Sequence, residues 1–266
     1  MWERSPSQPF DSENPIDFEN EAREFLELLQ TSREAVVLTG AGVSTDSGIP
    51  DFRSPDGLYS KVPSYIFDLD FFFNSPEEFY RLAKNHLYPM LNAQPNLTHI
   101  MLAKLEEYGL LKAVITQNID GLHQKAGSET VVELHGNLSN AVCTECGARY
   151  DVSYVLKRLQ NSPLPLCMEC GGLIKPDIVF FNETLPEEAL DKAMEFAEKA
   201  DLFIAMGTSL VVYPAASFPL TAKSSGALLI IVNRDSTPYD ELADRVWKME
   251  LLKFSRSVLK LMKAVT

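Results

Sequence analysis

Short apolar runs alternate along this chain with longer segments whose apolar positions recur at helical spacing. Six runs have the length and composition of buried strands, and they span residues 35–39, 112–116, 130–134, 177–181, 202–206 and 227–232. Helices are predicted over residues 17–30, 96–108, 186–199 and about 214–224, from Pro76 onward, and from near Ser255 to the C-terminus. This alternation predicts an α/β fold, a Rossmann-like and largely parallel sheet with helices on both faces.

In such sheets, ligands bind at the carboxyl ends of the strands. The polar residues that directly follow the predicted strands are therefore candidates for one shared cleft. They are residues 40–53, 117–123, 135–136, 182–183, 207–209 and 233–234.

The loop after the first predicted strand is the most informative segment. Gly40 and Gly42 stand where a strand presents backbone amides to a nucleotide pyrophosphate. The third glycine of the usual dinucleotide pattern would fall at Thr45, so the pattern is not the ordinary one. The loop continues to an acid, an aromatic ring and a guanidinium at residues 51–53, which is more than phosphate binding requires. This segment is therefore predicted to bind a nucleotide and also to contact the end of the nucleotide that reacts.

Four cysteines form two C-x2-C pairs, Cys143 with Cys146 and Cys167 with Cys170. This spacing indicates a tetrahedral zinc site made only of thiolates. Two disulfides or four free thiols are the alternatives, and a cytosolic chain argues against the disulfides. Four protein ligands leave no open position, so we expect the zinc to be structural and to hold together a small module over residues 137–175. Few basic residues lie in this module, which weighs against a nucleic-acid-binding zinc ribbon.

Composition limits the partners. The chain has 266 residues and a formal net charge of −13, which disfavours nonspecific nucleic-acid binding. No stretch approaches the ~20 apolar residues of a membrane span. Residues 1–16 are polar, without the basic and apolar regions of a signal peptide, and are interpreted as a mobile N-terminal arm. These features predict a cytoplasmic protein without membrane association.

Several motifs in one order resemble the sirtuins, the NAD-dependent protein lysine deacylases, and in particular the bacterial and thermophile-type members. The similarity extends from about residue 21 to residue 254. It rests on residues 40–53, 116–120 with 122–123, 134–136, the four cysteines, 175–181, 207–209 and 232–233.

The resemblance implies NAD as co-substrate, structural Zn²⁺, and a set of nucleotide-binding residues. These are Gly40, Ala41, Gly42, Thr45, Ile49, Asp51, Phe52, Arg53, Gln117, Asn118, Ile119, Asp120, Gly207, Thr208, Ser209, Asn233 and Arg234. The first loop would hold the pyrophosphate and the nicotinamide end, residues 117–120 the ribose and carboxamide, and residues 207–209 the adenosine side. Without the resemblance, a polar turn at residues 117–120 that caps the next helix is an equal alternative.

The resemblance also implies that His135 is the general base. Taken alone, a histidine after a strand is more often structural, and a role as zinc ligand is a further alternative. In the implied reaction, the acetyl-lysine oxygen attacks the nicotinamide ribose as nicotinamide leaves, and His135 takes a proton from a ribose hydroxyl. The products are nicotinamide, O-acetyl-ADP-ribose and free lysine. His86, His99 and His123 lie on predicted helices and are expected to be structural.

Acetyl-lysine proteins or peptides are the implied substrates, bound as an added strand between two segments. The substrate-peptide residues are Val179, Phe180, Phe181, Asn182 and Glu183, with Leu210, Val211, Val212 and Tyr213. Many sirtuins have glycine at the position of Asn182, and we expect asparagine to keep the loop because it tolerates positive φ. Sirtuins that remove acidic acyl groups carry Tyr-x-x-Arg, whereas here Tyr80 is followed by Ala83 at the arginine position, which favours uncharged acyl groups.

Two other functions remain open on this evidence: mono-ADP-ribosyl transfer to protein, and recognition of acetyl-lysine by a zinc module without turnover. The expected organisation is a nucleotide-binding domain interrupted by two insertions. It comprises residues 17–57, 91–136 and 176–266, with a helical module at residues 58–90 and the zinc module at residues 137–175.

Overall fold

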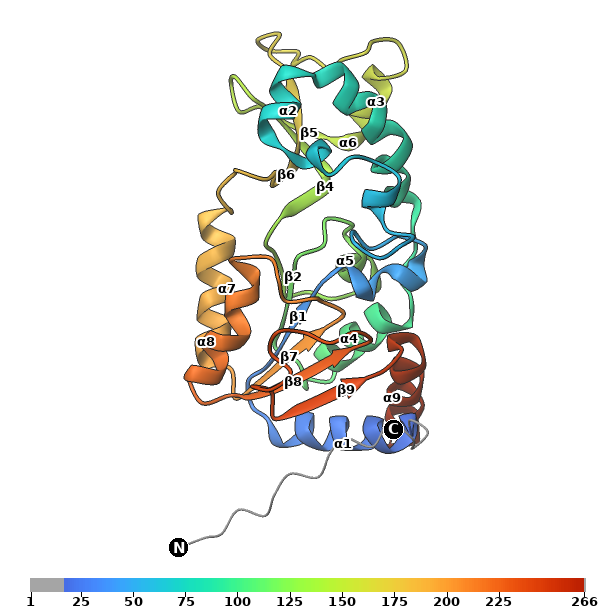
Figure 1. Cartoon of the computed structure of the whole chain (residues 1–266), viewed down its shortest axis with the longest axis vertical. Coiled ribbons are helices and arrows are strands. Elements are labelled where there is room, and N and C mark those ends of the chain that lie inside the picture. Colours follow the sequence, from blue (N-terminus) through green and yellow to red (C-terminus); the bar gives the residue numbers. More distant parts are fainter. Residues whose placement is uncertain (1–16, 266) are drawn as a thin grey trace, which may run out of the picture.

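A computed structural model describes residues 17–265, so the predicted arm at residues 1–16 lies outside the described residues. Figure 1 shows a larger lobe at the bottom and a smaller lobe at the top. The strands are β1 (Ala35–Thr39), β2 (Ala113–Thr116), β3 (Val131–Glu133), β4 (Gly136–Cys143), β5 (Arg149–Asp151), β6 (Ile174–Ile178), β7 (Leu202–Met206), β8 (Leu228–Asn233) and β9 (Arg245–Lys248). The α-helices are α1 (Phe18–Thr31), α2 (Leu69–Asn74), α3 (Pro76–His86), α4 (Leu97–Glu107), α5 (Leu122–Ala126), α6 (Val152–Arg158), α7 (Glu187–Lys199), α8 (Phe218–Ser224) and α9 (Leu251–Val265).

The large lobe is built on a six-stranded sheet in the order β3-β2-β1-β7-β8-β9. Each neighbouring pair is parallel, from Val114 beside Val131 to Ile231 beside Val246. This strand order is that of a doubly wound Rossmann fold, and the chain reverses direction across the sheet between β1 and β7. The predicted fold class is confirmed, and the sheet has its ligand-binding switch point between these two strands.

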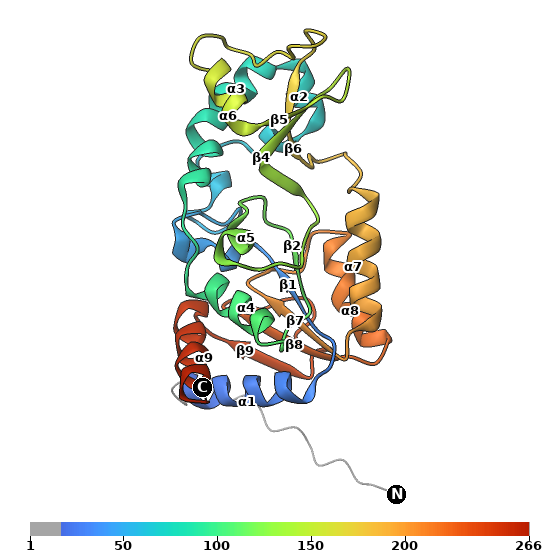
Figure 2. The same ribbon diagram turned by 180° about the vertical axis from the view of Figure 1, so that it is seen from behind.

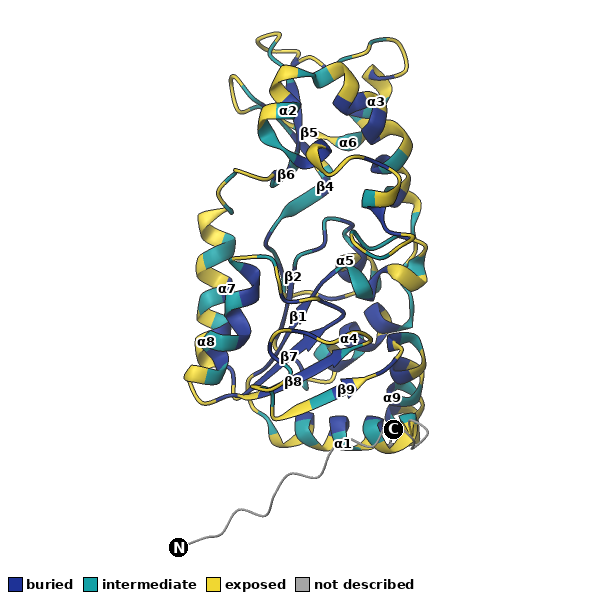
Figure 3. Cartoon of the chain, in the orientation of Figure 1, coloured by how far each residue is buried: buried dark blue, intermediate teal, exposed yellow. Residues whose placement is uncertain are grey.

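Helices cover both faces of this sheet. On one face α1, α4 and α9 pack against alternate strand residues such as Val37 and Ile204. On the other face α7 and α8 pack against Val36 and Phe203. Figures 1 and 2 show the two helical layers from opposite sides, and Figure 3 shows the strands buried between them. Burial on both faces explains why the strands are continuous apolar runs in the sequence.

Side chains at the helix ends explain where two of these helices begin. Asp17 precedes α1, and its carboxylate accepts hydrogen bonds from the free backbone N–H groups of Glu19 and Asn20. Asn96 and His99 form a reciprocal capping box at the start of α4. These caps satisfy N–H groups that have no partner within the helix.

The small lobe combines the two predicted insertions. Its three-stranded sheet has the order β5-β4-β6, and α2, α3 and α6 pack around it. Aromatic residues from α2, α3 and the segment after β6 fill the centre, with ring centroids 5.0–5.4 Å apart between Phe72, Phe79 and Phe180. Because residues 58–90 and 137–175 share one hydrophobic core, they stabilise each other. The division into domains by residue number stays a proposal.

The strands β4 and β5 and the helix α6 were not predicted, and three further elements differ from the prediction. The strand predicted at residues 177–181 is β6, which lies three residues earlier and pairs antiparallel with β4 in the small sheet. The apolar residues after Ile178 leave the sheet, and Phe180 enters the small-lobe core. The edge strand β9 was not predicted because Arg245 and Lys248 interrupt its apolar pattern. The C-terminal helix begins at Leu251, four residues before the predicted start.

Candidate active site

A cleft of about 980 Å³ is lined by residues of both lobes. The large lobe contributes the segments that follow β1, β2, β7 and β8, as expected for a doubly wound sheet. Phe67 and Phe180 contribute from the small lobe. The cleft therefore lies at the switch point between β1 and β7, with a polar floor and an apolar wall.

Most of the predicted site residues meet in this cleft. The lining includes Gly40, Ala41, Gly42, Thr45, Asp51, Phe52, Arg53, Gln117, Asn118, Ile119, His135, Val179, Phe180, Phe181, Asn182, Glu183, Gly207, Thr208, Ser209, Val212, Tyr213, Asn233 and Arg234. Four predicted residues do not line it. Ile49 and Leu210 are buried in the hydrophobic core, Asp120 is buried behind the floor, and Val211 is exposed outside the lining.

The glycines after β1 allow two loops to touch. The Gly42 N–H donates a hydrogen bond of 2.9 Å to the Gly207 carbonyl. A Cβ atom on Gly42 would lie 2.7 Å from that carbonyl oxygen, and one on Gly40 would lie 2.8 Å from the Thr208 Cβ. Only glycine fits at this approach, so the two glycines join the loops after β1 and β7 into one surface. The predicted nucleotide-binding role of both loops stays a proposal.

Two amide side chains join the loop after β2 to its neighbours. Gln117 Nε2 donates to Thr208 Oγ1 at 2.9 Å, and Asn118 Nδ2 donates to the Gly40 carbonyl and to Ser44 Oγ, both at 3.1 Å. Ser44 Oγ in turn donates to Asp120 Oδ2 at 2.7 Å. Asp120 therefore acts through Ser44 on the loop that Asn118 also contacts. These bonds hold the loops after β1, β2 and β7 in one arrangement.

The Asp-Phe-Arg triplet forms the rim of the cleft. Asp51 Oδ1 accepts hydrogen bonds from the N–H groups of Arg53 and Ser54, at 3.0 and 2.7 Å, which closes a tight turn. The Phe52 ring packs against Tyr59 and Phe67, with centroids 5.6 and 5.7 Å away. The turn thus presents an apolar ring and a guanidinium to the same cleft, and Asp51 has a structural role in addition to its place in the lining.

His135 lies between the two lobes, in the link from β3 to β4. Its Nδ1 is 2.8 Å from the Gln117 carbonyl oxygen. Because a carbonyl only accepts hydrogen bonds, Nδ1 carries the proton and Nε2 has the free lone pair in the neutral ring. Burial lowers the pKa of His135 below its ordinary value of 6.5, while the bond to Gln117 opposes this shift. The ring is therefore neutral at pH 7 and can accept a proton at Nε2.

We expect the pH profile of kcat/KM to reflect this neutral ring. Protonation of His135 would remove the predicted base, so activity should be lost as the pH falls through the pKa of this ring. Because that pKa is below 6.5, the acidic limb should have an apparent pKa below 6.5, and the rate should be independent of this group at pH 7 and above. Steady-state rates measured between pH 5 and 8 check this. An acidic limb centred above pH 7 would contradict it.

Asn182 lies in the left-handed region of backbone conformation, with φ of 70°. Asparagine was expected here because it tolerates positive φ. A β-branched residue in this region costs roughly 1–2 kcal/mol. We expect Asn182→Val to lower the free energy of unfolding by about that amount, whereas the matched variant Asn182→Gly should be no less stable than the parent. Denaturant unfolding of the three proteins measures the difference. Equal stability of the valine and glycine variants would show that the turn does not need positive φ.

The four cysteine sulfurs all lie within 4.8 Å of one another. Cys143 Sγ is 3.5 Å from Cys170 Sγ, and Cys146 Sγ is 3.6 Å from Cys167 Sγ. Four ligands at the usual Zn–S distance of ~2.3 Å would be about 3.8 Å apart at the corners of a tetrahedron, so the thiols fit a zinc ion and are too far apart for disulfides. The Tyr150 hydroxyl lies 3.0 Å from Cys167 Sγ and would donate to its thiolate.

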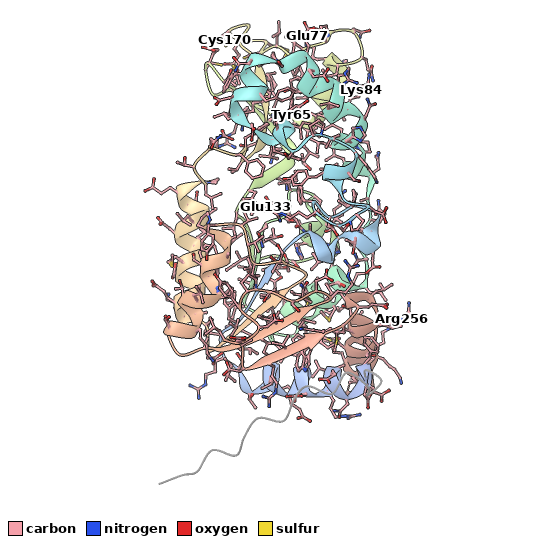
Figure 4. All side chains as sticks on the ribbon, viewed as in Figure 1. Tyr65, Glu77, Lys84, Glu133, Cys170 and Arg256 are labelled. Carbon is pink, nitrogen blue, oxygen red and sulfur yellow. The ribbon has the colours of Figure 1, made fainter. Side chains whose placement is uncertain are left out.

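The position of this cluster supports a structural role for the metal. Figure 4 places Cys170 at the far end of the small lobe, whereas Glu133, two residues before His135, lies near the middle of the molecule. None of the four cysteines lines the cleft. Zinc bound there would hold β4, the hairpin to β5 and the start of β6 together without touching the reacting groups.

Sequence reasoning missed part of the lining. The missed residues are Ser54, Tyr59, Phe67, Ile178, Thr184, Leu185, Leu190, Pro214, Asp235, Ser236, Met249, Glu250, Leu251 and Leu252. The last four directly follow β9, so the rule that found the other strand ends would have found them had that strand been predicted.

The residues of the predicted acyl-selectivity pattern, Tyr80 and Ala83, are buried in the small-lobe core outside the lining. Neither residue therefore places a side chain against the cleft.

His99 and His123 lie on helices, as expected, and do not line the cleft. Their rings are buried 4.9 Å apart, and His123 Nε2 lies 2.9 Å from Thr39 Oγ1. Burial lowers the pKa of His99 to about 4 and that of His123 to about 3, so both rings are neutral at pH 7. They pack beneath the loop after β1.

Known proteins match this chain along most of its length. A model of the Sir2 family matches residues 40–214. The NAD-dependent protein deacetylase of Thermotoga maritima is 54% identical over 238 residues, which cover 90% of this chain and 97% of the relative. NAD-dependent protein deacetylase 1 of Pyrobaculum aerophilum is 50% identical over 232 residues, which cover 87% and 91%.

Solved structures give the same result. A Sir2 variant with a deacetylated p53 peptide and 3′-O-acetyl ADP-ribose has a TM-score of 0.87 and 53% identity, covering 90% of this chain and 97% of the other. A Sir2 structure with a p53 peptide and NAD⁺ has a TM-score of 0.86 and 51% identity, covering 92% and 99%. From its sequence, its strand order and the residues of its cleft, this chain belongs to the Sir2 family.

Proposed function

We propose that this protein removes acetyl groups from lysine side chains of proteins in an NAD-dependent reaction that yields nicotinamide, O-acetyl-ADP-ribose and free lysine. The observation that carries the proposal is the neutral His135 ring, with Nε2 free in a cleft that also contains the two joined glycine loops. Close relatives named NAD-dependent protein deacetylase support it. Binding of acetyl-lysine without turnover would not need such a base.

The nucleotide would lie along the floor of the cleft. Backbone amides near Gly40 and Gly42 suit the pyrophosphate, and Thr208 and Asn233 suit the adenosine side. Bound NAD would supply a ribose carbon for attack by the acyl oxygen, with nicotinamide as the leaving group, and a ribose hydroxyl that can be deprotonated and can accept the acetyl group. Asn118 and Asp120 would fix the loop that faces the nicotinamide end, since Ser44 joins them.

His135 would accept the proton of the ribose hydroxyl. Its Nδ1–H bond to the Gln117 carbonyl keeps Nε2 as the acceptor and stabilises the ring after it gains a charge. The apolar residues Phe52 and Phe180 would exclude water from the acyl group until the proton has moved. Zinc takes no part in these steps, because its ligands lie outside the cleft.

Acetyl-lysine peptides would bind as a strand between residues 179–183 and 209–213. Among the described residues, the Val179 carbonyl and the Asn182 N–H have no hydrogen-bond partner, so both are available to a peptide. Solved Sir2 structures contain an acetylated and a propionylated peptide, which supports uncharged acyl groups here. The cleft offers these groups the apolar rings of Phe67 and Phe180.

Location and other partners are part of the proposal. No helix among residues 17–265 is long and apolar enough to cross a membrane. We expect a cytoplasmic protein, because four thiols arranged for zinc require reducing surroundings. The net charge of −13 argues against direct nucleic-acid binding.

Labelled NAD distinguishes the two enzymatic functions. The protein is incubated with an acetyl-lysine peptide and NAD labelled in its adenine. A deacetylase leaves the label on small molecules and frees the lysine, whereas an ADP-ribosyltransferase leaves the label on protein or peptide. A reaction without NAD is the control. Label that remains covalently attached to protein, with the acetyl group retained, would overturn the proposal.

A further inference from the structure

Residues 178–183, at the end of β6 and after it, are shaped by an ion pair between a buried lysine and a partly exposed glutamate, which the reaction itself does not explain. Lys175 is 8% exposed and does not line the cleft. Its ammonium lies 3.0 Å from Glu183 Oε2 and donates to the Ile178 carbonyl at 2.7 Å. It also lies 4.6 Å from the centre of the Phe180 ring. One cation thus contacts the beginning, the middle and the end of a single short segment.

Glu183, the last residue of this segment, bonds back to Phe180 near its middle. Its Oε2, besides facing Lys175, accepts a hydrogen bond of 2.8 Å from the Phe180 N–H. The Glu183 N–H donates to the Phe180 carbonyl at 3.1 Å, so Phe180 and Glu183 form a tight turn with Asn182 at positive φ. Lys175 is the buried member of the pair, and its ammonium would carry a large desolvation cost without the Glu183 carboxylate, so the turn and Lys175 stabilise each other.

The remaining backbone groups of the segment are fixed by both lobes. The Val179 N–H donates to the His135 carbonyl at 2.9 Å, and the Phe181 N–H donates to the Phe67 carbonyl at 2.7 Å. Within residues 17–265, no hydrogen bond occupies the Val179 carbonyl, the Asn182 N–H, or the carbonyls of Asn182 and Glu183, and an added peptide strand can use the first two. Val179 and Asn182 both line the cleft, whereas Lys175 does not, so the ion pair fixes a segment whose free backbone groups belong to cleft-lining residues.

We propose that Lys175 and Glu183 form a positioning clamp that holds residues 178–183 in the shape that accepts the acetyl-lysine peptide. The inference rests on the proposed function, because it assigns the clamp to the peptide side of that cleft. The clamp acts on peptide affinity and leaves both the nucleotide floor and Nε2 of His135 in place. Glu183 lines the cleft and can contact a peptide directly, whereas Lys175 does not line the cleft and acts only through the segment.

Lys175→Met, Glu183→Gln and the double variant test the clamp. Each is expected to raise KM for an acetyl-lysine peptide about tenfold, with kcat changed less than about threefold. The affinity for ADP-ribose should be unchanged. The double variant should resemble the single ones, because residues that act as one unit give non-additive effects. Lys199→Met removes an exposed ion pair with Glu195 on α7 and is the matched control, with no expected change in KM.

Amide hydrogen exchange in the absence of substrate provides a measurement independent of activity. The clamp predicts faster exchange at Phe180 and Glu183 in the three variants and no change at β1. If the parent protein did not deacetylate, the proposed function would fail, and the exchange data would still decide the clamp.

If a single variant does not fold, the double variant decides, since it leaves no buried charge unpaired. A wild-type KM in Lys175→Met or in the double variant would overturn the proposal. Parent-like exchange at Phe180 in a folded variant would also overturn it.

Discussion

Replacing His135 with alanine is expected to lower kcat for deacetylation by a factor on the order of 10²–10⁴, the usual contribution of a positioned general base. The reason is local. The ring is held by one bond from Nδ1 to the Gln117 carbonyl, and its Nε2 is the acceptor that remains in a partly buried cleft. Alanine removes the acceptor without adding bulk. Initial rates at saturating NAD and peptide measure the effect.

His86→Ala is the matched control for this experiment. His86 ends α3 in the small lobe and does not line the cleft, so its removal should leave kcat within about twofold. The His135 variant should still bind ADP-ribose, because the glycine loops and Thr208 are unchanged. A His135 variant that kept most of its activity would mean that another group takes the proton.

Removal of zinc is expected to have the second largest effect, with loss of activity and of small-lobe structure. The four cysteines join β4, the β5 hairpin and the start of β6, and a structural zinc site of this kind contributes its binding energy to folding. The small-lobe core also contains Phe180, which supports the cleft wall. Loss of the metal far from the cleft should therefore disturb the peptide side of the cleft.

A chelator titration with a colour-forming zinc indicator measures this effect. We expect about one zinc released per chain, a parallel loss of near-ultraviolet circular dichroism and activity, and recovery when zinc is added. Cys170→Ser should be purified with little zinc. Met168→Ser is its matched control, because this exposed residue lies between the last two cysteines and contributes no ligand. Full activity in the metal-free protein would refute a structural role for zinc.

The parallel sheet was predictable because its strands are buried on both faces and so appear as uninterrupted apolar runs. β9 lacks that signal, since it lies at the sheet edge and begins and ends with a cation. β6 was misplaced because Lys175 and Pro176 resemble loop residues. In the fold, Lys175 is buried by an ion pair with Glu183, eight residues later, which no local pattern indicates.

Much of the cleft followed from one rule, that ligand-binding residues stand at the carboxyl ends of parallel strands. The rule and the family resemblance placed His135, Asn118 and Gly207 in the lining, as observed. The rule does not distinguish a side chain that lines the cleft from one that holds the cleft-lining loops in place. Asp120 therefore appeared among the binding residues, although it lies behind Ser44. That distinction needs coordinates, because it depends on contacts between separate loops.

The most direct test of the account is the product balance of one reaction. The protein, an isotopically acetyl-labelled lysine peptide and NAD are incubated, and the products are measured by mass spectrometry over time. We predict equal amounts of deacetylated peptide, nicotinamide and ADP-ribose that carries the labelled acetyl group. Nicotinamide release with the acetyl group still on the peptide, or labelled free acetate without NAD consumption, would contradict NAD-dependent deacetylation in this cleft.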